Sequence, residues 1–542
     1  MPGDEQCCFT GQNSSFWGRN LTSAVNNGSV AATRLEDMGV RILAAWYLLG
    51  QDDSAYPKPN FDSFDLTAPI NEHINVNKLH KPQSLMREIG AAGTVLVKNK
   101  RKKNGHKALP FKKANGHTPN RISVLGSDAG PAFMGSNYFL DRGGSDGTLG
   151  IGWGSGSAEY SYLVSPYEAL QRRAIQDGTS FQWSFNDFDL ARAKAVSNEL
   201  LGVDASIVFV QSDSGEGYHT IDENAGDRNN LTAWHQGNEL IKAVASVQSN
   251  TIVVIHSPGQ LDVEPWADHP NVTAILFAHM PGSESGNAIT DVLYGDYNPS
   301  GRLPYTVAKN RSDYGVEVTY VNRSTSLYPQ VNYTEGLLID YRHFDAKEIQ
   351  PRYEFGFGLS YTSFEYRGLK GSWLDQPNKR TEHLSKKQDE HQRHPHPCSN
   401  KDQSKSDQGK SHAASNAGQL GPYTEWLLPE GSLPHTAGLP ASLFADIFEF
   451  SFSVTNTGDS SGHEVPQAYL VFPESAGEPP KVLRRFDRVW VPKGESKEVH
   501  WKLNRYDFSV WSSVAGKWVK PDGQFQIWVG SSSRKIKQKL KL

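Results

Sequence analysis

The sequence predicts an α/β domain followed by a small β-sandwich, and three observations support this order. Between about residue 81 and residue 367, short apolar runs alternate with helical stretches, as in a mostly parallel sheet covered by helices. From about residue 440 onward, apolar and polar residues alternate and turn residues recur, which favours a β-sandwich. The length of 542 residues is enough for three domains or more.

The composition argues against two broad classes of function. With 55 Lys and Arg against 59 Asp and Glu, the formal charge is −4, so no global positive field favours nucleic acid. No run of about 18 apolar residues is present, so no membrane-spanning segment is expected. The three cysteines (Cys7, Cys8 and Cys398) have no metal-binding spacing and cannot form a disulfide framework.

The elements of the α/β region are predicted from apolar runs and helical periodicity. An amphipathic helix is expected at residues 30–49, and residues 51–80 are expected to be a connector. Strands are expected at 93–97, 122–125, 205–210, 251–255 and 272–277, with helices at 166–174, 187–200, 237–248 and 284–294. Ligands of such sheets bind at the carboxyl ends of the strands, so the loops that follow these runs are the places to search.

The β region is predicted from a clean alternation of Phe448, Phe450, Phe452 and Val454. A turn is expected at residues 456–459, and further strands are expected at 467–472, 484–491, 498–503 and 524–529.

Two polar inserts interrupt these patterns. Residues 98–113 hold eight basic residues and no acidic one, and a solvated loop is favoured over an anion-binding one. Residues 376–412 hold eight Lys or Arg, five Asp or Glu, five His and no aromatic residue, which predicts disorder. Metal binding by these histidines is the less favoured alternative, and no metal site is predicted.

Three glycine-rich loops are the candidates for chemistry. Asp213–Tyr218 places Glu216 between two glycines beyond a buried strand, where a carboxylate can be a general acid if its pKa is raised. From spacing alone, a plain turn carboxylate is the favoured interpretation. Gly152–Gly156 lacks the Lys-Ser/Thr ending of a phosphate-binding loop. In Pro281–Gly286, Ser283 is predicted to cap a helix and Glu284 to lie in its first turn.

Several segments together resemble fungal β-glucosidases of glycoside hydrolase family three. Asp213–Trp234 looks like the hallmark stretch of that family. Further segments resemble other motifs of the family, in the same order along the chain: Gly152–Gly156, Met280–Gly286, Asp340–Phe344, Tyr353–Tyr361, Glu464–Tyr469 and Gly530–Arg534.

The resemblance implies an architecture of a (β/α)8 barrel, an (α/β)6 sandwich and a fibronectin type III-like domain. Residues 1–50 are then a remnant of the C-terminal end of the barrel, and residues 51–80 a linker. Residues 81–367 form the sandwich, 368–439 a linker with the disordered insert, and 440–542 the fibronectin type III-like domain. A cysteine pair of similar enzymes is replaced here by Phe139 and Gly144.

The resemblance also implies roles for individual residues. In a retaining glycosidase, one carboxylate attacks while a second, about 5 Å away, protonates the leaving oxygen. Glu216 matches the acid/base, and Ser155 and Tyr218 match residues that line the sugar sites. The nucleophile of the family is an Asp followed by Trp on the barrel. No Asp-Trp pair occurs in this sequence, so the nucleophile and most of the barrel are expected to be absent.

The substrate that the resemblance implies is a β-glucoside or cello-oligosaccharide, cleaved at its terminal, non-reducing β-D-glucosyl residue. No cofactor is expected, because carboxylates alone supply this chemistry.

Signals for the cellular compartment conflict. Eight N-x-S/T sequons are candidate glycosylation sites and favour a secreted protein, as does the resemblance: Asn13, Asn20, Asn27, Asn230, Asn271, Asn310, Asn322 and Asn332. The first residues, Met1–Glu5, do not read as a signal peptide. Two alternatives to a β-glucosidase stay open: a non-catalytic carbohydrate-binding or surface protein that retains the C-terminal domains, and an unstable fragment. The oligomeric state is not predicted.

Overall fold

The computed structural model describes residues 17–56, 82–100, 107–111, 118–137, 146–152, 158–214, 220–221, 224–225, 228–317, 331–374 and 441–542. The chain divides into two compact units, residues 1–81 and 82–542, which are described one at a time. The predicted insert at 376–412 and most of the predicted connector at 51–80 lie outside the described residues.

The first unit contains two helices, α2 (Arg19–Asn26) and α3 (Ala32–Leu48). Helix α3 confirms the helix predicted at residues 30–49. Neither helix has a buried residue, and Val40, Ile42 and Leu48 are well exposed although they are apolar.

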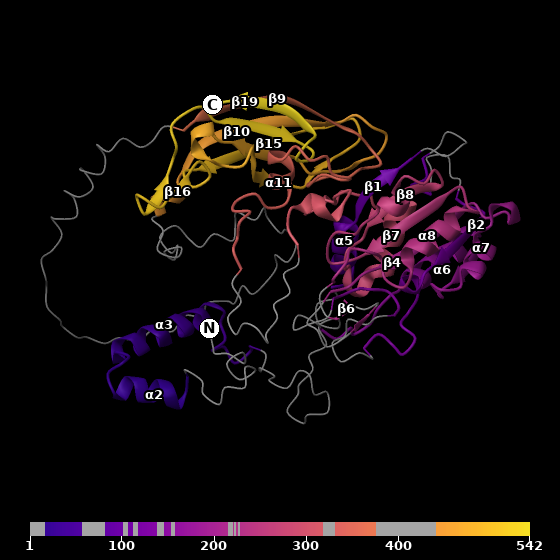
Figure 1. Ribbon diagram of the computed structural model, residues 1–542, viewed down its shortest axis with the longest axis horizontal. Coiled ribbons are helices and arrows are strands. Elements are labelled where there is room, and N and C mark those ends of the chain that lie inside the picture. Colours follow the sequence, from indigo (N-terminus) through magenta and orange to yellow (C-terminus); the bar gives the residue numbers. More distant parts are fainter. Residues whose placement is uncertain are drawn as a thin grey trace, which may run out of the picture. The chain divides into compact units, whose positions relative to one another are not determined.

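The α/β domain, residues 82–363, is built around a six-stranded sheet (Figure 1). Its strands are β1 (Val95–Asn99), β2 (Arg121–Leu125), β3 (Ser180–Ser184), β4 (Ala205–Gln211), β7 (Thr251–His256) and β8 (Val272–Phe277). Their order across the sheet is β1-β8-β7-β4-β2-β3, and only β1 runs antiparallel to its neighbour. The predicted mostly parallel sheet is therefore confirmed.

Helices cover both faces of this sheet, which explains why its strands are apolar on both sides. On one face, α7 (Leu190–Ser197), α8 (Gly237–Ala245) and α9 (Glu264–Ala267) pack on Val208, Val253 and their neighbours. On the other face, α5 (Gln83–Gly93), α6 (Pro166–Asp177) and α10 (Ser285–Tyr294) pack on the alternate residues of the same strands.

Helix α6 shows how local sequence sets an element. Ser165 and Glu168 form a capping box at its N-terminus, and Pro166 occupies the first helical position. Gly178 ends the helix in the left-handed conformation, with φ of 69°. These signals are why the predicted helix at 166–174 is confirmed, with one further turn at its C-terminal end.

The polar insert predicted at residues 98–113 is only partly solvated. Residues 101–106 and 112–113 lie outside the described part of the chain. Lys98 belongs to β1 and is buried, with 7% of its surface exposed. Its ammonium reaches the backbone carbonyl of Ala267. Ala108, Leu109 and Phe111 return to the core between the two gaps. The prediction of a solvated loop was wrong. The many basic residues of the insert dominate its composition, although three of its apolar residues are buried in the core.

The β domain, residues 364–374 and 441–542 of the described chain, is a sandwich of two main sheets (Figure 1). One sheet has the order β15-β10-β9, with β9 at Phe364–Trp373, β10 at Asp446–Asn456 and β15 at Ser496–Asn504. The second has the order β13-β12-β18-β19, with strands at Val482–Phe486, Gln467–Val471, Gln526–Gly530 and Ile536–Lys541. Two short pairs, β11–β14 (Gly462–Glu464, Val489–Val491) and β16–β17 (Val510–Ser512, Lys517–Val519), complete it.

The position of β9 corrects the predicted domain boundary. Residues 364–367 were assigned to the α/β domain and 368–373 to a linker, but they form one strand, which pairs with β10 through residues 364–367 and 370–373. The sequence did not predict this strand, because Gly368 and Gly371 interrupt the alternation of apolar and polar residues. Gly371 lies against the ring of Phe448. An ideal Cβ at Gly371 would approach Phe448 to 2.7 Å.

Motifs from both domains meet at their junction. Arg302 donates to both carboxylate oxygens of Glu464 at 3.1 Å, and the hydroxyl of Tyr366 donates to the same carboxylate at 2.8 Å. Arg534 donates to Asp345, which also accepts from Lys481. The segments 340–344, 353–361, 464–469 and 530–534 therefore join the domains.

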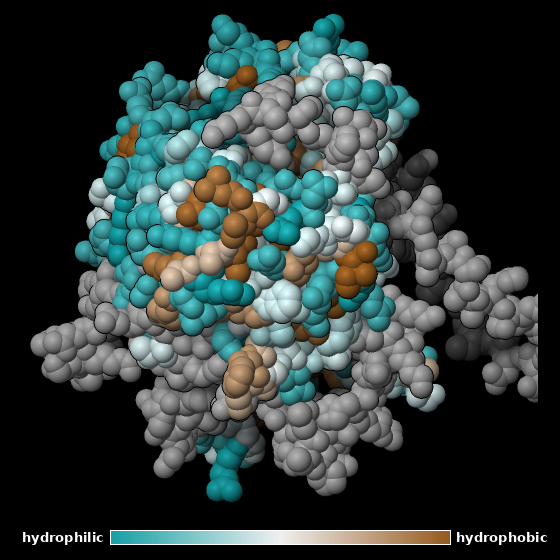
Figure 2. All heavy atoms as spheres, turned by 90° about the vertical axis from the view of Figure 1, so that its right-hand side faces the viewer, coloured by the Kyte–Doolittle hydropathy of each residue, from teal (hydrophilic) through white to brown (hydrophobic). Residues whose placement is uncertain are grey.

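The surface shown in Figure 2 is mostly hydrophilic, with small apolar groups rather than one broad apolar patch. Among the described residues, no helix combines the length and apolarity needed to cross a bilayer.

Candidate functional site

The candidate site lies where the strand order of the sheet reverses. From β2 the chain crosses to β3 at one edge, then returns past β2 to form β4 on its other side. The loops that leave β2 and β4 therefore run in opposite directions and open a crevice at the carboxyl ends of these strands. Such a switch point is the usual ligand site of an open α/β sheet. The loop after β2 leads to Gly152–Gly156, and the loop after β4 leads to Asp213–Tyr218.

The three predicted site residues, Ser155, Glu216 and Tyr218, lie outside the described residues. Residues flanking both loops are described. Beyond the second loop, β5 (Thr220–Ile221) and β6 (Asn224–Ala225) form a short antiparallel pair. Ser214 and this pair are the described residues that flank Glu216 in the sequence.

The three glycine-rich loops converge at Gly152. An ideal Cβ at this glycine would lie 3.0 Å from Oδ1 of Asp213 and 3.3 Å from the sulfur of Met280. It would also lie 3.5 Å from the carbonyl oxygen of Ser214. Gly150 and Gly282 are joined by a backbone hydrogen bond of 2.9 Å. The structure thus brings together the starts of the segments that contain Ser155, Glu216 and Glu284.

A buried pair, Asp128 and His256, ties these loops to the sheet. Nδ1 of His256 lies 2.7 Å from Oδ2 of Asp128, and both residues are at most 1% exposed. The other oxygen of Asp128 accepts the backbone N–H of Leu149 at 2.9 Å. The backbone carbonyl of His256 accepts the N–H of Ser212 at 3.1 Å. One pair therefore connects the loop before Ser155 with the loop before Glu216.

Further polar groups surround this pair. Gln211, which is in register with His256 on the adjacent strand, donates from Nε2 to the carbonyl of Gly147 at 3.2 Å. Asp187 accepts from the backbone N–H and the hydroxyl of Ser127, and burial raises the pKa of its carboxyl. Among the described residues, Nε2 of His256 has no hydrogen-bond partner. The floor of the crevice is therefore polar and almost fully buried.

Asp213 is the charge closest in sequence to Glu216 among the described residues. It is fully buried, and its Oδ1 accepts the backbone N–H of Ser214 at 2.7 Å. Burial raises the pKa of Tyr160, and the negative charge of Asp213 raises it further. Burial lowers the pKa of Arg228, an effect that Tyr305 and Asp213 oppose. A second negative group at the root of the loop favours a protonated neighbour, which suits a general acid.

The segment after β8 differs from its prediction. Ser283 does not cap the helix: residues Gly282–Glu284 form a 3-10 turn, and α10 begins at Ser285 without a side-chain cap. Glu284 is instead buried, and it accepts from the hydroxyl of Tyr162 at 2.7 Å and from Asn287 at 2.6 Å. The structural role favoured for Glu284 thus stands, but through side-chain hydrogen bonds rather than at a helix cap.

His279, between β8 and this turn, adopts a left-handed backbone with φ of 57°. Its Nε2 lies 2.9 Å from the hydroxyl of Tyr305. Burial, together with the nearby His256, lowers the pKa of His279 to about 4. The imidazole is therefore neutral at pH 7. Sequence reasoning missed His279, His256 and Asp128, although each follows or ends a buried apolar run at the same edge of the sheet.

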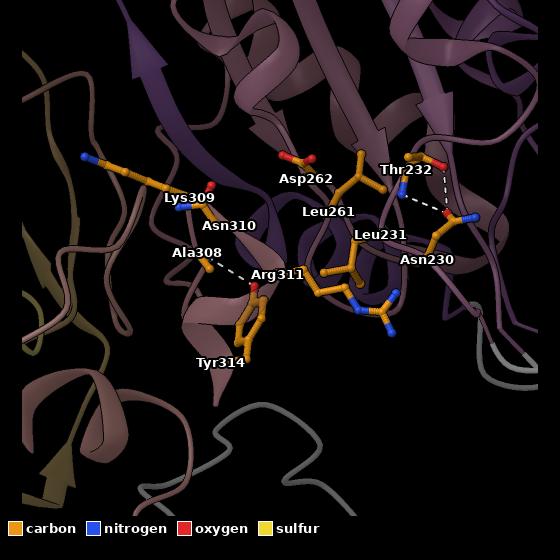
Figure 3. Close-up of a pocket in the computed structure, with 10 residues that line it drawn as sticks. All are labelled: Asn230, Leu231, Thr232, Leu261, Asp262, Ala308, Lys309, Asn310, Arg311 and Tyr314. Atoms are coloured by element: carbon orange, nitrogen blue, oxygen red, sulfur yellow. Dashed lines mark hydrogen bonds between the residues drawn. The ribbon is translucent and has the colours of Figure 1, made fainter. Parts of the chain in front are cut away.

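A separate hollow of about 190 Å³ adjoins the segment that follows β6 (Figure 3). Ten residues from three segments line it: Asn230–Thr232, Leu261, Asp262, Ala308–Arg311 and Tyr314. Oδ1 of Asn230 accepts from the backbone and hydroxyl of Thr232, and the hydroxyl of Tyr314 accepts from the N–H of Ala308. Two predicted glycosylation asparagines, Asn230 and Asn310, therefore lie on one hollow.

The other predicted glycosylation sites fall in different settings. Asn20, Asn27, Asn310 and Asn332 are exposed, whereas Asn13 and Asn322 lie outside the described residues. Asn271 is the exception, because its amide nitrogen donates to the carbonyl of Ala245 at 2.7 Å and Thr273 of its sequon is 3% exposed within β8. The folded protein is therefore a poor setting for a glycan at Asn271.

Within the described part of the chain, no three His, Cys, Asp or Glu side chains form a group suited to a metal ion. The predicted histidine group of the 376–412 insert and the positions Phe139 and Gly144 lie outside that part.

Comparison with known proteins shows which family this fold resembles. The model of the glycosyl hydrolase family 3 C-terminal domain matches residues 94–361, and that of a fibronectin type III-like domain matches residues 464–533. "Probable beta-glucosidase L" of Aspergillus fumigatus is 43% identical over 539 residues, which is 99% of this chain. The chain spans 62% of the length of that relative.

Two solved structures of fungal enzymes are also similar. The β-glucosidase D2-BGL from Chaetomella raphigera superposes with a TM-score of 0.78 at 38% identity, over all of this chain and 64% of that one. A glycoside hydrolase family 3 β-glucosidase from Neurospora crassa superposes with a TM-score of 0.80 at 37% identity, over 97% of this chain and 66% of that one.

Proposed function

Because the chain belongs to glycoside hydrolase family 3, we propose that it carries the acid/base half of a retaining β-glucosidase site. The observation that carries this proposal is the likeness of 99% of the chain to a protein named as a β-glucosidase. The location of Asp213 and Ser214, which begin the segment that contains Glu216, at the switch point of the sheet supports it.

In this proposal, Glu216 is the acid/base. It protonates the departing glycosidic oxygen and then, as a carboxylate, removes a proton from the attacking water. The buried Asp213 at the root of the loop helps to keep Glu216 protonated for the first step. Ser155 and Tyr218 contact the glucosyl unit.

The substrates in this proposal are β-glucosides and cello-oligosaccharides, cleaved at their non-reducing end. The attacking carboxylate is not among the 542 residues, because no Asp-Trp pair occurs in them. A retaining mechanism requires this carboxylate about 5 Å from Glu216. In this proposal, a barrel segment of the kind expected in the longer relatives supplies it. We also propose an extracellular location, which glycan analysis of the protein from its natural source would test.

The 542-residue chain alone is expected to show no measurable hydrolysis of an aryl β-glucoside, because protonation without an attacking carboxylate leaves the main barrier in place. The measurement is release of nitrophenol by the purified chain. The same chain joined to an upstream barrel segment from a relative should be active, and Glu216→Gln in that joined form should lower kcat at least 100-fold, in keeping with the usual contribution of general acid catalysis.

Robust turnover by the 542 residues alone would contradict the assignment of the nucleophile. Undiminished turnover by the Glu216→Gln variant of the joined form would contradict the role of Glu216. Asp459→Asn, on the β domain, is a charge-matched control that should leave turnover unchanged.

A further inference from the structure

A groove with a volume of about 1170 Å³ crosses the outer face of the three-stranded sheet of the β domain, formed by β9, β10 and β15. The strand register places two rows of side chains side by side along its floor. Each row takes one residue from each strand: Ser372, Glu449 and Lys502 in the first, and Lys370, Ser451 and His500 in the second.

The floor is rigid because its opposite side is packed. Between the two rows, Phe450 and Trp501 point inward, with their ring centroids 5.7 Å apart, and both are at most 9% exposed. Strand β10 is central in the sheet and pairs on both sides, so the floor residues are held by backbone hydrogen bonds from two directions.

One wall of the groove is the segment Arg485–Asp487, which is anchored against the edge strand β15. Nε of Arg485 donates to the carbonyl of Lys502 at 2.9 Å, and Nη2 of Arg485 donates to Asp507 at 2.6 Å. This anchoring presents the ring of Phe486 at the rim, where it is 67% exposed. A fixed, exposed aromatic ring beside polar side chains is suited to stack on the apolar face of a sugar ring.

Much of the hydrogen-bonding capacity of the floor is unused inside the protein. In the described chain, no side-chain hydrogen bond or ion pair engages Lys370, Glu449, Ser451 or His500. These four side chains offer hydroxyl, carboxylate, ammonium and imidazole groups to a ligand lying across the strands.

The charges of the groove balance. Three cationic residues (Lys370, Arg485 and Lys502) and three carboxylates (Asp446, Glu449 and Asp487) line it. A polyanion or a polycation would meet as much repulsion as attraction there, whereas an uncharged polyol can accept and donate along the whole floor. The volume is also larger than a single small-molecule pocket needs, which favours a chain of sugars.

We propose that this groove binds an uncharged β-linked glucan chain, apart from the catalytic crevice. The choice of a glucan among neutral polyols rests on the proposed function. The groove would keep the polymer close to the enzyme while its ends are processed.

The test is affinity electrophoresis of the 542-residue chain through gels containing barley β-glucan or hydroxyethyl cellulose. The wild-type chain should be retarded by either polymer. Phe486→Ala should weaken binding about three- to tenfold, and Glu449→Ala with His500→Ala should weaken it further. Trp511→Ala removes a ring that is 54% exposed on the same domain but outside the groove, and it should have no effect.

Several outcomes would overturn the proposal: no retardation by either neutral polymer, retardation that Trp511→Ala reduces as much as Phe486→Ala does, or retardation only by carboxymethyl cellulose. The chain carrying Glu216→Gln should bind the polymer as wild type does. A failure of the catalytic assignment is therefore distinguishable, because polymer binding is measured without turnover and turnover on a small aryl glucoside does not need the groove.

Discussion

At the scale of single residues, the Asp128–His256 pair is the feature on which the candidate site depends most. Its 2.7 Å contact is fully buried and connects the loops before Ser155 and Glu216. The sequence did not predict this pair, because its two residues are far apart in the sequence and belong to no recognisable motif. Only the order of the strands brings β2 and β7 close enough for the contact.

Two variants of His256 separate hydrogen bonding from packing. Asparagine can place its amide nitrogen where Nδ1 lies and keep a donor to Asp128, whereas glutamine extends toward the position of Nε2. His256→Gln is therefore expected to lower the free energy of unfolding by about 2–4 kcal/mol, because it leaves a buried carboxylate short of a partner. His256→Asn should cost clearly less.

Urea unfolding monitored by tryptophan fluorescence would measure both changes. Hydrogen exchange at residues 146–150 and 212–214 should increase in His256→Gln only. Equal losses of stability in the two variants would show that packing, and not the bond to Asp128, sets the effect.

His279 predicts a dependence of stability on pH. Its pKa in the folded protein is about 4, below the value of about 6.5 for an unfolded histidine. Between these values the unfolded chain binds more protons than the folded one, so stability falls as the pH drops from about 6.5 to about 4. This residue should contribute about 3 kcal/mol to that fall.

The test compares urea midpoints of wild type and His279→Gln at pH 7.0 and pH 4.5. The variant should lose less stability on acidification than wild type does. His463, whose pKa burial also lowers to about 4, is a matched control outside the site, and its own variant should reduce the fall independently. Identical pH profiles for wild type and His279→Gln would contradict the prediction.

At the scale of elements, the strands that are buried on both faces of the sheet are the ones that the sequence predicted accurately. The runs at β4, β7 and β8 are buried along their whole length, and their predicted bounds agree with the structure to within a residue. Strand β3, with the sequence SFQWS, was missed because it is an edge strand in which only the last residue is buried. Edge strands bury one side only and leave a weaker apolar signal.

The candidate loops themselves could be predicted from glycine content and from their places after strands. Their supporting contacts could not. Asp213, Asp128 and Asp187 look like ordinary turn residues in sequence, and only burial distinguishes them from solvated ones. The resemblance supplied the role of Glu216, which spacing alone did not favour.

At the scale of the whole molecule, a buried ion pair joins the α/β and β domains. Arg302 and Glu464 are 8% and 4% exposed at their side chains, and Tyr366 completes the carboxylate's hydrogen bonds. Glu464→Ala should lower the free energy of unfolding by about 3–5 kcal/mol, because it leaves the buried guanidinium of Arg302 without its carboxylate partner.

Calorimetry would measure the change, and the two domains should unfold in separate steps in this variant if the pair couples them. Asp459→Ala is the matched control: its pair with Lys493 is exposed, and its loss should change stability by less than about 1 kcal/mol. A Glu464→Ala variant as stable as this control would contradict the coupling.

The pairing of β9 with β10 has a consequence for the chain between them. Trp373 and Phe448 face each other in the sheet although residues 374–447 separate them along the chain. The entropy lost on closing such a long loop grows only with the logarithm of its length, by about 0.6 kcal/mol for each doubling. A reporter sequence inserted between residues 375 and 440 is therefore expected to change the folding free energy of the β domain very little.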